Sequence, residues 1–239
     1  MCEIEELFGG FKIYISKDHK FGTDAFLLAD FAAQRAGGSV LDLCAGCGIV
    51  GFLLGLIAAP RRVCAVEIQK EATELMKLTV AANQLFNFEV MLADLKELNV
   101  AKVKGGVFDL VTCNPPYKAK RAGILNKSEN LSISRHEIMC DINDICRVAS
   151  CFLKVGGRLC LCQRSERLVD TLEAMRTNGV EPKRIRFVSS RQCRAPWLFL
   201  VDGRKDGKPF LKIEAPLFLE DEGGPTPELL RIYRKEAKI

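Results

Sequence analysis

Apolar runs alternate with stretches of helical period along the chain from residue 39 onward. Short runs without a polar break predict buried strands, whereas apolar residues spaced three and four apart predict helices that pack on them. In this way we predict five strands, over residues 40–44, 63–68, 88–92, 108–113 and 158–162. Helices are predicted from the end of the glycine-rich segment 46–48 through residue 57, over 70–85 and over 142–153. This alternation is typical of a parallel sheet with helices on both faces.

The two ends of the chain add to this plan. Residues 184–189 and 197–202 follow each other without a helix between them, so we expect an antiparallel hairpin at the sheet edge. Ahead of the first strand lie an extended stretch at 11–15 and a helix over Thr23–Ala33, and a short amphipathic helix begins at Glu228. The pattern therefore predicts an α/β fold with a doubly wound, mostly parallel, seven-stranded sheet.

Composition narrows the class of protein. A chain of 239 residues with 48% hydrophobic and 27% charged residues suits one soluble globular domain. We expect that domain to span 1–239, with an amino-terminal motif and lid region at 1–38 and a core at 39–239. The sequence has no apolar run of the roughly 18 residues that a membrane span needs, and its acidic amino terminus does not resemble an export signal. We therefore expect a cytoplasmic protein without a membrane partner, and a monomer by default.

The eleven cysteines do not predict a disulfide framework, because their number is odd, the chain is long and several lie inside apolar runs. Cys44 and Cys47 form a C-x-x-C pair, but the sequence has no second pair. His19 and His136 are its only histidines that could complete a tetrahedral metal site. We expect reduced, mostly buried thiols and no bound metal.

The net charge of +5 is unevenly distributed. Residues 183–208 contain eight basic residues against two acids, and residues 118–135 contain five against Glu129. Phosphate groups bind to such clusters of cations, so both stretches favour a polyanionic partner, although solvated loops without a partner would carry the same residues. The five basic residues of the stretch 118–135 are Lys118, Lys120, Arg121, Lys127 and Arg135.

A G-x-G-x-x-G motif at 46–51 follows the first strand, and Glu67 ends the next strand where a ribose-binding acid belongs. Glycines let the backbone approach a cofactor, and a carboxylate accepts hydrogen bonds from ribose hydroxyls. The motif alone fits a dinucleotide oxidoreductase, a methyltransferase or a plain tight corner. Asp42, four residues before Gly46, suits a cofactor that ends in an ammonium group and would repel a pyrophosphate. It favours S-adenosylmethionine over NAD.

Asp94 closes the third strand. Its side chain could accept a hydrogen bond from the amino group of an adenine, or it could cap the helix that follows. The position of Asp94 in the order of elements favours contact with the adenine.

The segment Asn114-Pro115-Pro116-Tyr117 follows a central apolar strand, at the strand end where open α/β sheets place ligands. An exocyclic amino nitrogen is a poor nucleophile because its lone pair is delocalised into the ring. If the Asn114 side-chain oxygen and the Pro115 carbonyl accept its two hydrogens, the lone pair can turn toward an electrophilic methyl group. Tyr117 would stack on a flat base. A Pro-Pro turn explains the prolines, but not the flanking Asn114 and Tyr117.

The motif Asn114–Tyr117 matches the [DNS]-P-P-[YFW] motif of the amino-methyltransferases, and the strand plan is similar to that of class I methyltransferases. The segment FGTDAFLLA at 21–29 resembles the leading motif of the bacterial tRNA(Val) adenine-N6 methyltransferases, and the resemblance runs from about residue 8 to the final helix. It implies a Rossmann-like fold, S-adenosylmethionine as cofactor, and methylation of adenine N6 in RNA, in a tRNA next to the anticodon. The basic residues of the stretch 118–135 would then contact the RNA.

The resemblance also implies a role for individual residues. Cys44 stands where relatives often have glycine, so its side chain would narrow the turn. The implied cofactor ligands are Thr23 and Asp24 at the methionine end, Asp42, Gly46 and Gly48 along the tail, Glu67 at the ribose, Asp94 at the adenine, and Asn114, which also holds the target with Pro115, Pro116 and Tyr117.

Several alternatives compete with RNA adenine as the target. Related enzymes use the N-P-P-Y motif on guanine in ribosomal RNA and on protein glutamine. The leading motif and the basic stretches favour RNA, and a glutamine enzyme usually carries a separate helical domain ahead of the first strand. An NAD-dependent oxidoreductase would leave Asp42 and Asn114 unexplained. A non-catalytic RNA-binding protein is disfavoured because both residues are intact.

Overall fold

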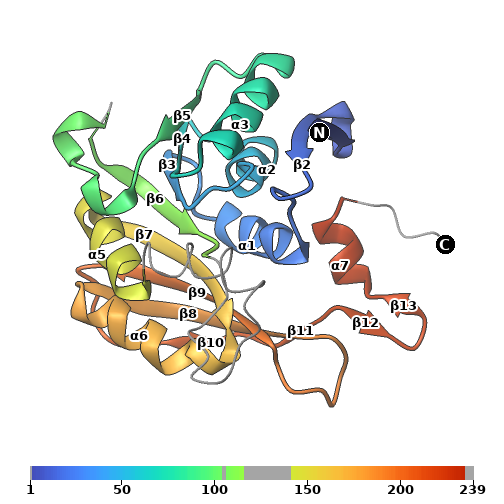
Figure 1. The fold of residues 1–239 in the computed structure, drawn as a ribbon. Coiled ribbons are helices and arrows are strands. Elements are labelled where there is room, and N and C mark those ends of the chain that lie inside the picture. Colours follow the sequence, from blue (N-terminus) through green and yellow to red (C-terminus); the bar gives the residue numbers. More distant parts are fainter. Residues whose placement is uncertain (1, 104–105, 116–140, 235–239) are drawn as a thin grey trace, which may run out of the picture.

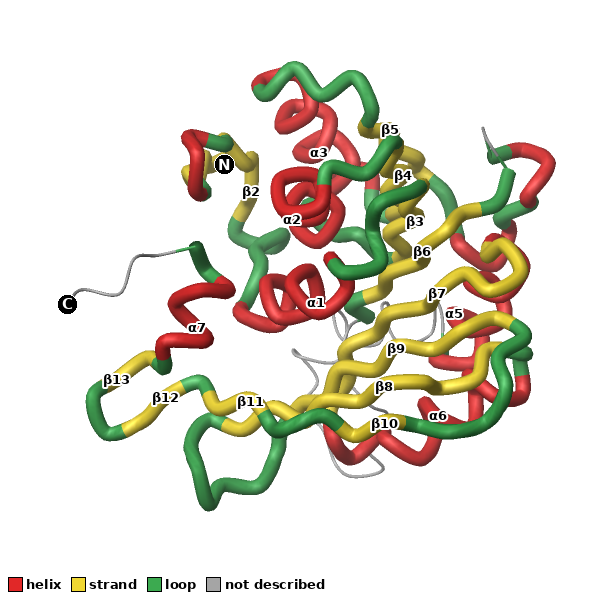
Figure 2. The backbone as a smooth tube through the Cα atoms, turned by 180° about the vertical axis from the view of Figure 1, so that it is seen from behind, coloured by secondary structure: helices red, strands yellow, loops and turns green. Residues whose placement is uncertain are grey.

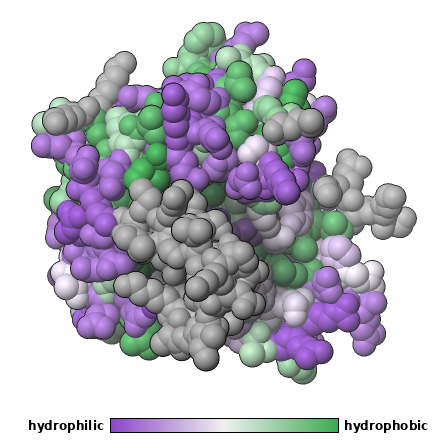
Figure 3. Space-filling view, in the orientation of Figure 1, coloured by the Kyte–Doolittle hydropathy of each residue, from purple (hydrophilic) through white to green (hydrophobic). Residues whose placement is uncertain are grey.

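The computed structural model describes residues 2–103, 106–115 and 141–234 of the chain (Figure 1). Within these ranges, no helix is both long enough and apolar enough to cross a membrane. On the face of the molecule drawn in Figure 3, hydrophilic residues cover much of the surface, and smaller apolar areas lie between them.

A nine-stranded sheet runs through the molecule in the order β10, β8, β9, β7, β6, β3, β4, β5, and β11 also pairs with β8. The strands from β7 to β5 are parallel, whereas β9 is antiparallel to both of its neighbours. The strands are β3 (Ser39–Leu43), β4 (Arg62–Glu67), β5 (Phe88–Leu92), β6 (Phe108–Cys113), β7 (Leu153–Arg164), β8 (Val180–Ser189), β9 (Leu198–Lys205), β10 (Lys212–Ile213) and β11 (Leu217–Phe218).

Helices cover both faces of this sheet (Figure 2). The first face carries α1 (Thr23–Ala33), α2 (Ile49–Ala58) and α3 (Lys70–Ala82), and the second face carries α5 (Ile142–Phe152) and α6 (Leu168–Thr177). The short helix α7 (Pro227–Ile232) packs against α1. Two small antiparallel hairpins lie outside the main sheet, formed by β1 (Cys2–Glu6) with β2 (Lys12–Ser16) and by β12 (Glu220–Asp221) with β13 (Gly224–Pro225).

Successive residues of each strand point to opposite faces of the sheet, and they contribute to two separate hydrophobic clusters. Along β3, Val40 packs in the cluster under α1 and α2, whereas Leu41 and Leu43 pack in the cluster under α5 and α6. Because alternate residues of a strand point to the same face, Asp42 is directed toward α1 and α2. The sheet thus places a carboxylate beneath the two helices whose amino-terminal ends border the strand ends.

The predicted class of fold is confirmed, with three differences of detail. The β8–β9 pair is antiparallel as predicted, but β10 and β11 add to β8, so the sheet has nine strands rather than seven. The helix α6 was not predicted. β7 begins at Leu153 rather than at Arg158, and it follows α5 without a loop.

Candidate active site

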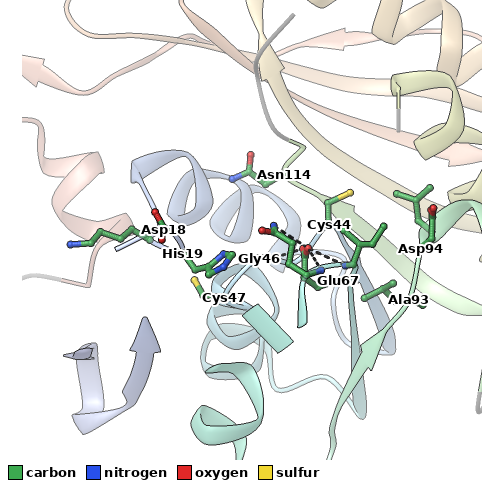
Figure 4. Close-up of a pocket in the computed structure, with 14 residues that line it drawn as sticks. Asp18, His19, Cys44, Gly46, Cys47, Glu67, Ala93, Asp94 and Asn114 are labelled. Atoms are coloured by element: carbon green, nitrogen blue, oxygen red, sulfur yellow. Dashed lines mark hydrogen bonds between the residues drawn. The ribbon is translucent and has the colours of Figure 1, made fainter. Parts of the chain in front are cut away.

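Two adjoining cavities lie at the carboxyl ends of the parallel strands, with volumes of about 260 Å³ and about 150 Å³. The larger cavity reaches Glu67 and Asp94, and the smaller one reaches Asp24 and Asp42. Figure 4 shows the larger cavity, with residues from the β2–α1 loop and from the ends of β3, β4, β5 and β6 gathered around it. The cavities form one cleft because they share the lining residues Lys20, Cys44, Gly46, Cys47 and Asn114.

The turn after β3 depends on left-handed backbone conformations. Gly46 has a φ of 57° and Gly48 a φ of 82°. A Cβ atom on Gly48 would lie 2.7 Å from the Phe52 ring and 2.8 Å from the Met76 side chain, so only glycine fits there. Cys44 has a φ of 54°, a conformation that glycine adopts without strain, and this explains physically why glycine suits its position.

Glu67, the last residue of β4, fixes this turn and faces the larger cavity. Its Oε2 accepts a hydrogen bond from the Gly46 amide at 2.9 Å. Its Oε1 accepts hydrogen bonds from the amides of Ile68 and Gln69, both at 3.0 Å. Three backbone donors therefore hold the carboxylate in one orientation at the wall of the cleft (Figure 4).

Asp42 is buried at the floor of the smaller cavity. Its Oδ1 accepts a hydrogen bond from the Thr112 hydroxyl at 2.7 Å, and its Oδ2 accepts one from the Gly51 amide at 3.2 Å. Burial raises the pKa of Asp42 from 3.8 to about 7, the two hydrogen bonds oppose this shift, and the nearby Glu67 carboxylate adds to it. A cationic group placed beside Asp42 would stabilise the charge that the buried site now disfavours.

Asn114 follows β6, and residues distant in sequence hold its side chain. Its Nδ2 donates a hydrogen bond to Asp24 Oδ2 at 2.9 Å, from the first turn of α1. The Cys162 thiol of β7 donates to Asn114 Oδ1 at 3.0 Å. Together these two contacts fix the orientation of the Asn114 side-chain amide, with Nδ2 toward Asp24 and Oδ1 toward Cys162. The Asn114 Oδ1 is therefore the hydrogen-bond acceptor on the side of Cys162.

The other predicted cofactor ligands are placed unequally. Asp94 lines the larger cavity. It also accepts a hydrogen bond from the Lys96 amide at 2.9 Å, so the same side chain caps the short helical turn that follows β5 and forms part of the cleft wall. Thr23 lines neither cavity; its Oγ1 lies 2.6 Å from the hydroxyl oxygen of Tyr233, which follows α7. Its expected place near the cofactor stays a prediction.

Sequence reasoning missed the loop between β2 and α1, which supplies Asp18, His19 and Lys20 to the cleft (Figure 4). Lys20 lines both cavities and is the one lysine or arginine among their described lining residues. Its signal in the sequence is its position directly before the FGTD segment.

Part of the predicted site lies outside the described residues. Pro115 is described and buried after β6. The remaining catalytic and RNA-contacting candidates, which lie outside the described ranges, are Pro116, Tyr117, Lys118, Lys120, Arg121, Lys127 and Arg135.

The stretch 183–208 is only partly available to a polyanion. Lys183 Nζ donates to the carbonyl oxygens of residues 208–210, and Lys205 Nζ to those of residues 150 and 153. Arg184 is buried beside Asp202, and the Arg186 guanidinium binds Glu228 through two hydrogen bonds. With Arg191, which pairs with Glu220, five of the eight basic residues have partners within the described fold, and phosphate binding by this stretch stays a prediction.

The fold and the cleft define a class I methyltransferase. Residues 13–177 match the family model of the methyltransferase small domain. The chain belongs to this family, and the S-adenosylmethionine expected from the sequence is the cofactor of this class of enzymes.

Bacterial proteins with the expected activity in their names are similar to the chain. The chain is 28% identical over 192 residues to a tRNA1(Val) (adenine(37)-N6)-methyltransferase of Porphyromonas gingivalis, which covers 77% of this chain and 74% of the relative. It is 31% identical over 117 residues to a protein of the same name from Pseudoalteromonas translucida, across 49% of this chain and 48% of the relative.

Solved structures share the fold. A predicted O-methyltransferase from Agrobacterium tumefaciens aligns with a TM-score of 0.70 at 24% identity, over 88% of this chain and 95% of its own. A Thermus thermophilus 16S rRNA N2 G1207 methyltransferase, solved with AdoMet and guanosine, aligns with a TM-score of 0.59 at 17% identity, over 86% of this chain and 50% of its own.

Proposed function

We propose that this protein transfers a methyl group from S-adenosylmethionine to the exocyclic N6 of an adenine in RNA, in a tRNA next to the anticodon. The observation that carries the proposal is the side chain of Asn114, which opens the N-P-P-Y segment, borders the cofactor cleft and is oriented by Asp24 and Cys162. The names of the bacterial relatives support the choice of adenine.

The chemistry of the cleft fits the cofactor. At one end Asp42 and Asp24 would receive the ammonium of the methionine part, and Lys20 would pair with its carboxylate. At the other end Glu67 would hold the ribose and Asp94 the adenine amino group. When bound, S-adenosylmethionine supplies an electrophilic methyl group.

The protein's own part in the reaction is to prepare the amino group. Because Asp24 binds the Asn114 amide nitrogen, the Asn114 oxygen accepts one amino hydrogen, and the Pro115 carbonyl accepts the other. These contacts favour a pyramidal nitrogen, whose lone pair is no longer shared with the ring. The nitrogen becomes positively charged on methylation and then loses a proton to water, so the site needs no strong base.

The test is to incubate the protein with radiolabelled S-adenosylmethionine and total RNA from a strain that lacks its gene, followed by digestion to nucleosides. We expect labelled N6-methyladenosine that is traced to one tRNA. Asn114→Ala should abolish the label but only reduce the thermal shift produced by S-adenosylhomocysteine, because Asn114 is one of several residues that line the cofactor cleft. Label in methylated guanosine or only in protein would overturn the choice of target, and a thermal shift with NAD alone would overturn the cofactor.

A further inference from the structure

A cationic and an aromatic side chain meet at the end of β7. Cys162, which contacts Asn114, is followed two residues later by the exposed Arg164. Alternate residues of a strand share one face and lie about 7 Å apart. Arg164 therefore lies on the same face of the sheet as Cys162, which is the face that carries α1, and about 7 Å farther along the strand from the contact with Asn114. Its guanidinium carbon lies 5.2 Å from the centre of the Trp197 ring.

The position of Trp197 is fixed by the sheet. Its amide donates to the Val188 carbonyl at 3.1 Å, and its carbonyl accepts from the Ser165 amide at 3.3 Å. The indole is half-buried and packs against the cluster under α1. Because β9 runs antiparallel to β7, its first residues lie at the same sheet edge as the cleft. Trp197 can therefore support Arg164 beside the proposed target.

The surroundings of this pair favour a polyanion. The loop 190–196, which joins β8 to β9, is exposed and carries Arg191 and Arg194. Arg191 pairs with Glu220, but within the described residues Arg194 has no acidic side chain within ion-pair distance. A guanidinium backed by an indole offers a flat cation, and unpaired RNA bases stack on the planes of arginine side chains.

Resting on the proposed function, we propose that Arg164 and Trp197 form a second RNA subsite beside the target site. An unpaired nucleotide that flanks the target adenine stacks its base on the Arg164 guanidinium, which Trp197 supports from the other side. The positive charge of Arg194 attracts the phosphates of the same RNA strand. The subsite thus selects an adenine in a single-stranded loop rather than in a duplex.

Trp197 is the one tryptophan of the chain, so its fluorescence reports directly on this subsite. We would titrate the protein, saturated with S-adenosylhomocysteine, with an RNA hairpin that has an adenine in its loop. A fully paired RNA duplex of the same length is the comparison. We expect saturable quenching of the tryptophan emission by the hairpin and little by the duplex. Equal quenching by both RNAs would overturn the subsite.

The variants separate stacking from charge. Arg164→Gln should weaken hairpin binding about tenfold, a loss that corresponds to one stacked base. Arg164→Lys keeps the charge without the plane and should bind almost as weakly; full binding by Arg164→Lys would overturn the stacking. Arg204→Gln is the matched control, because Arg204 is an exposed arginine at the opposite end of β9.

These outcomes are distinguishable from a failure of the proposed function. Each variant should keep its melting temperature and the thermal shift with S-adenosylhomocysteine. If wild-type protein methylates RNA but Arg164→Gln binds the hairpin as tightly as wild type, the subsite is overturned and the function stands. If wild-type protein neither binds nor methylates RNA, both proposals fail.

Discussion

Among single residues, Asp42 ties the stability of the protein to pH. Its pKa is 3.8 in the unfolded chain and about 7 in the fold, so the folded state binds the proton more tightly. The resulting stability is fully present below the unfolded pKa and is lost as pH rises through about 7. We expect cofactor-free wild-type protein to lose stability between about pH 4 and about pH 7. Thermal melts across that range would measure the loss.

Asp42→Asn provides the comparison, because an amide cannot lose a proton there and the Thr112 hydroxyl can turn to accept from it. The difference in melting temperature between variant and wild type should grow with pH, with the variant more stable at the alkaline end. A constant difference across the range would mean that Asp42 titrates like an ordinary aspartate.

Gly46 and Gly48 allow a matched prediction about the turn. Both adopt a left-handed conformation, in which alanine is strained by roughly 1–2 kcal/mol. A Cβ on Gly46 would meet nothing within 4 Å, whereas one on Gly48 would press on Phe52 and Met76. Gly48→Ala should therefore lower the free energy of unfolding by about 1–3 kcal/mol more than Gly46→Ala, as measured by urea denaturation. Equal losses would contradict the packing around Gly48.

At the scale of elements, the loop between β2 and α1 lends Lys20 to both cavities. If Lys20 pairs with the cofactor's carboxylate, Lys20→Ala should weaken binding of S-adenosylhomocysteine about tenfold, as loss of a charge-assisted contact predicts. Methylthioadenosine lacks the amino-acid part, so its affinity should not change. Calorimetric titration of both ligands measures this, and an equal loss for the two would mean that Lys20 acts only by shaping the loop.

Helices and strands could be predicted where the local pattern of apolar and polar residues was clear. β5 and β6 lie where they were predicted because apolar runs bounded by polar residues define them. The first half of β7 was missed because Lys154 and the glycines at 156 and 157 interrupt its apolar run. The helix α6 was missed because its buried face is small and includes the polar Thr171, while its apolar Val169 is 73% exposed.

The candidate site was predictable only in part, for a similar reason. Glu67 and Asp94 could be found because each stands at or just after a strand end, and Asp42 because it precedes Gly46 by four residues. The contact of Asn114 with Asp24 spans 90 residues, and no local pattern reports such a separation. Cys162 had no polar signal at all, since it looked like any other buried residue of its strand.

At the scale of the whole molecule, one buried acid joins three elements. Asp202 of β9 is fully buried, and its oxygens lie 3.4 Å from Arg158 of β7, 3.5 Å from Arg184 of β8 and 3.8 Å from Arg35, which follows α1. Asp202→Ala would remove this counter-charge from Arg158 and Arg35 and would leave Arg184 with Glu214, 3.5 Å away, so we expect a loss of about 3–5 kcal/mol in the free energy of unfolding.

Urea denaturation of Asp202→Ala beside Glu173→Ala would check this expectation, because Glu173 is an exposed acid within the helix α6. The control should lose little. A loss below about 1 kcal/mol for Asp202→Ala would mean that the arginines remain solvated without their partner.

The order of the sheet has a consequence for synthesis on the ribosome. β9 lies between β7 and β8, yet it is made after both. β8 therefore leaves the ribosome before the strand that joins it to the sheet, and it has no neighbour in the sheet until β9 has been made. A chain that stops in the loop 190–196 exposes the apolar edge of β7, which is the kind of edge that draws other chains into aggregates. Truncated products of this length should thus be cleared or held by chaperones, whereas chains that continue past Lys205 can close the sheet themselves.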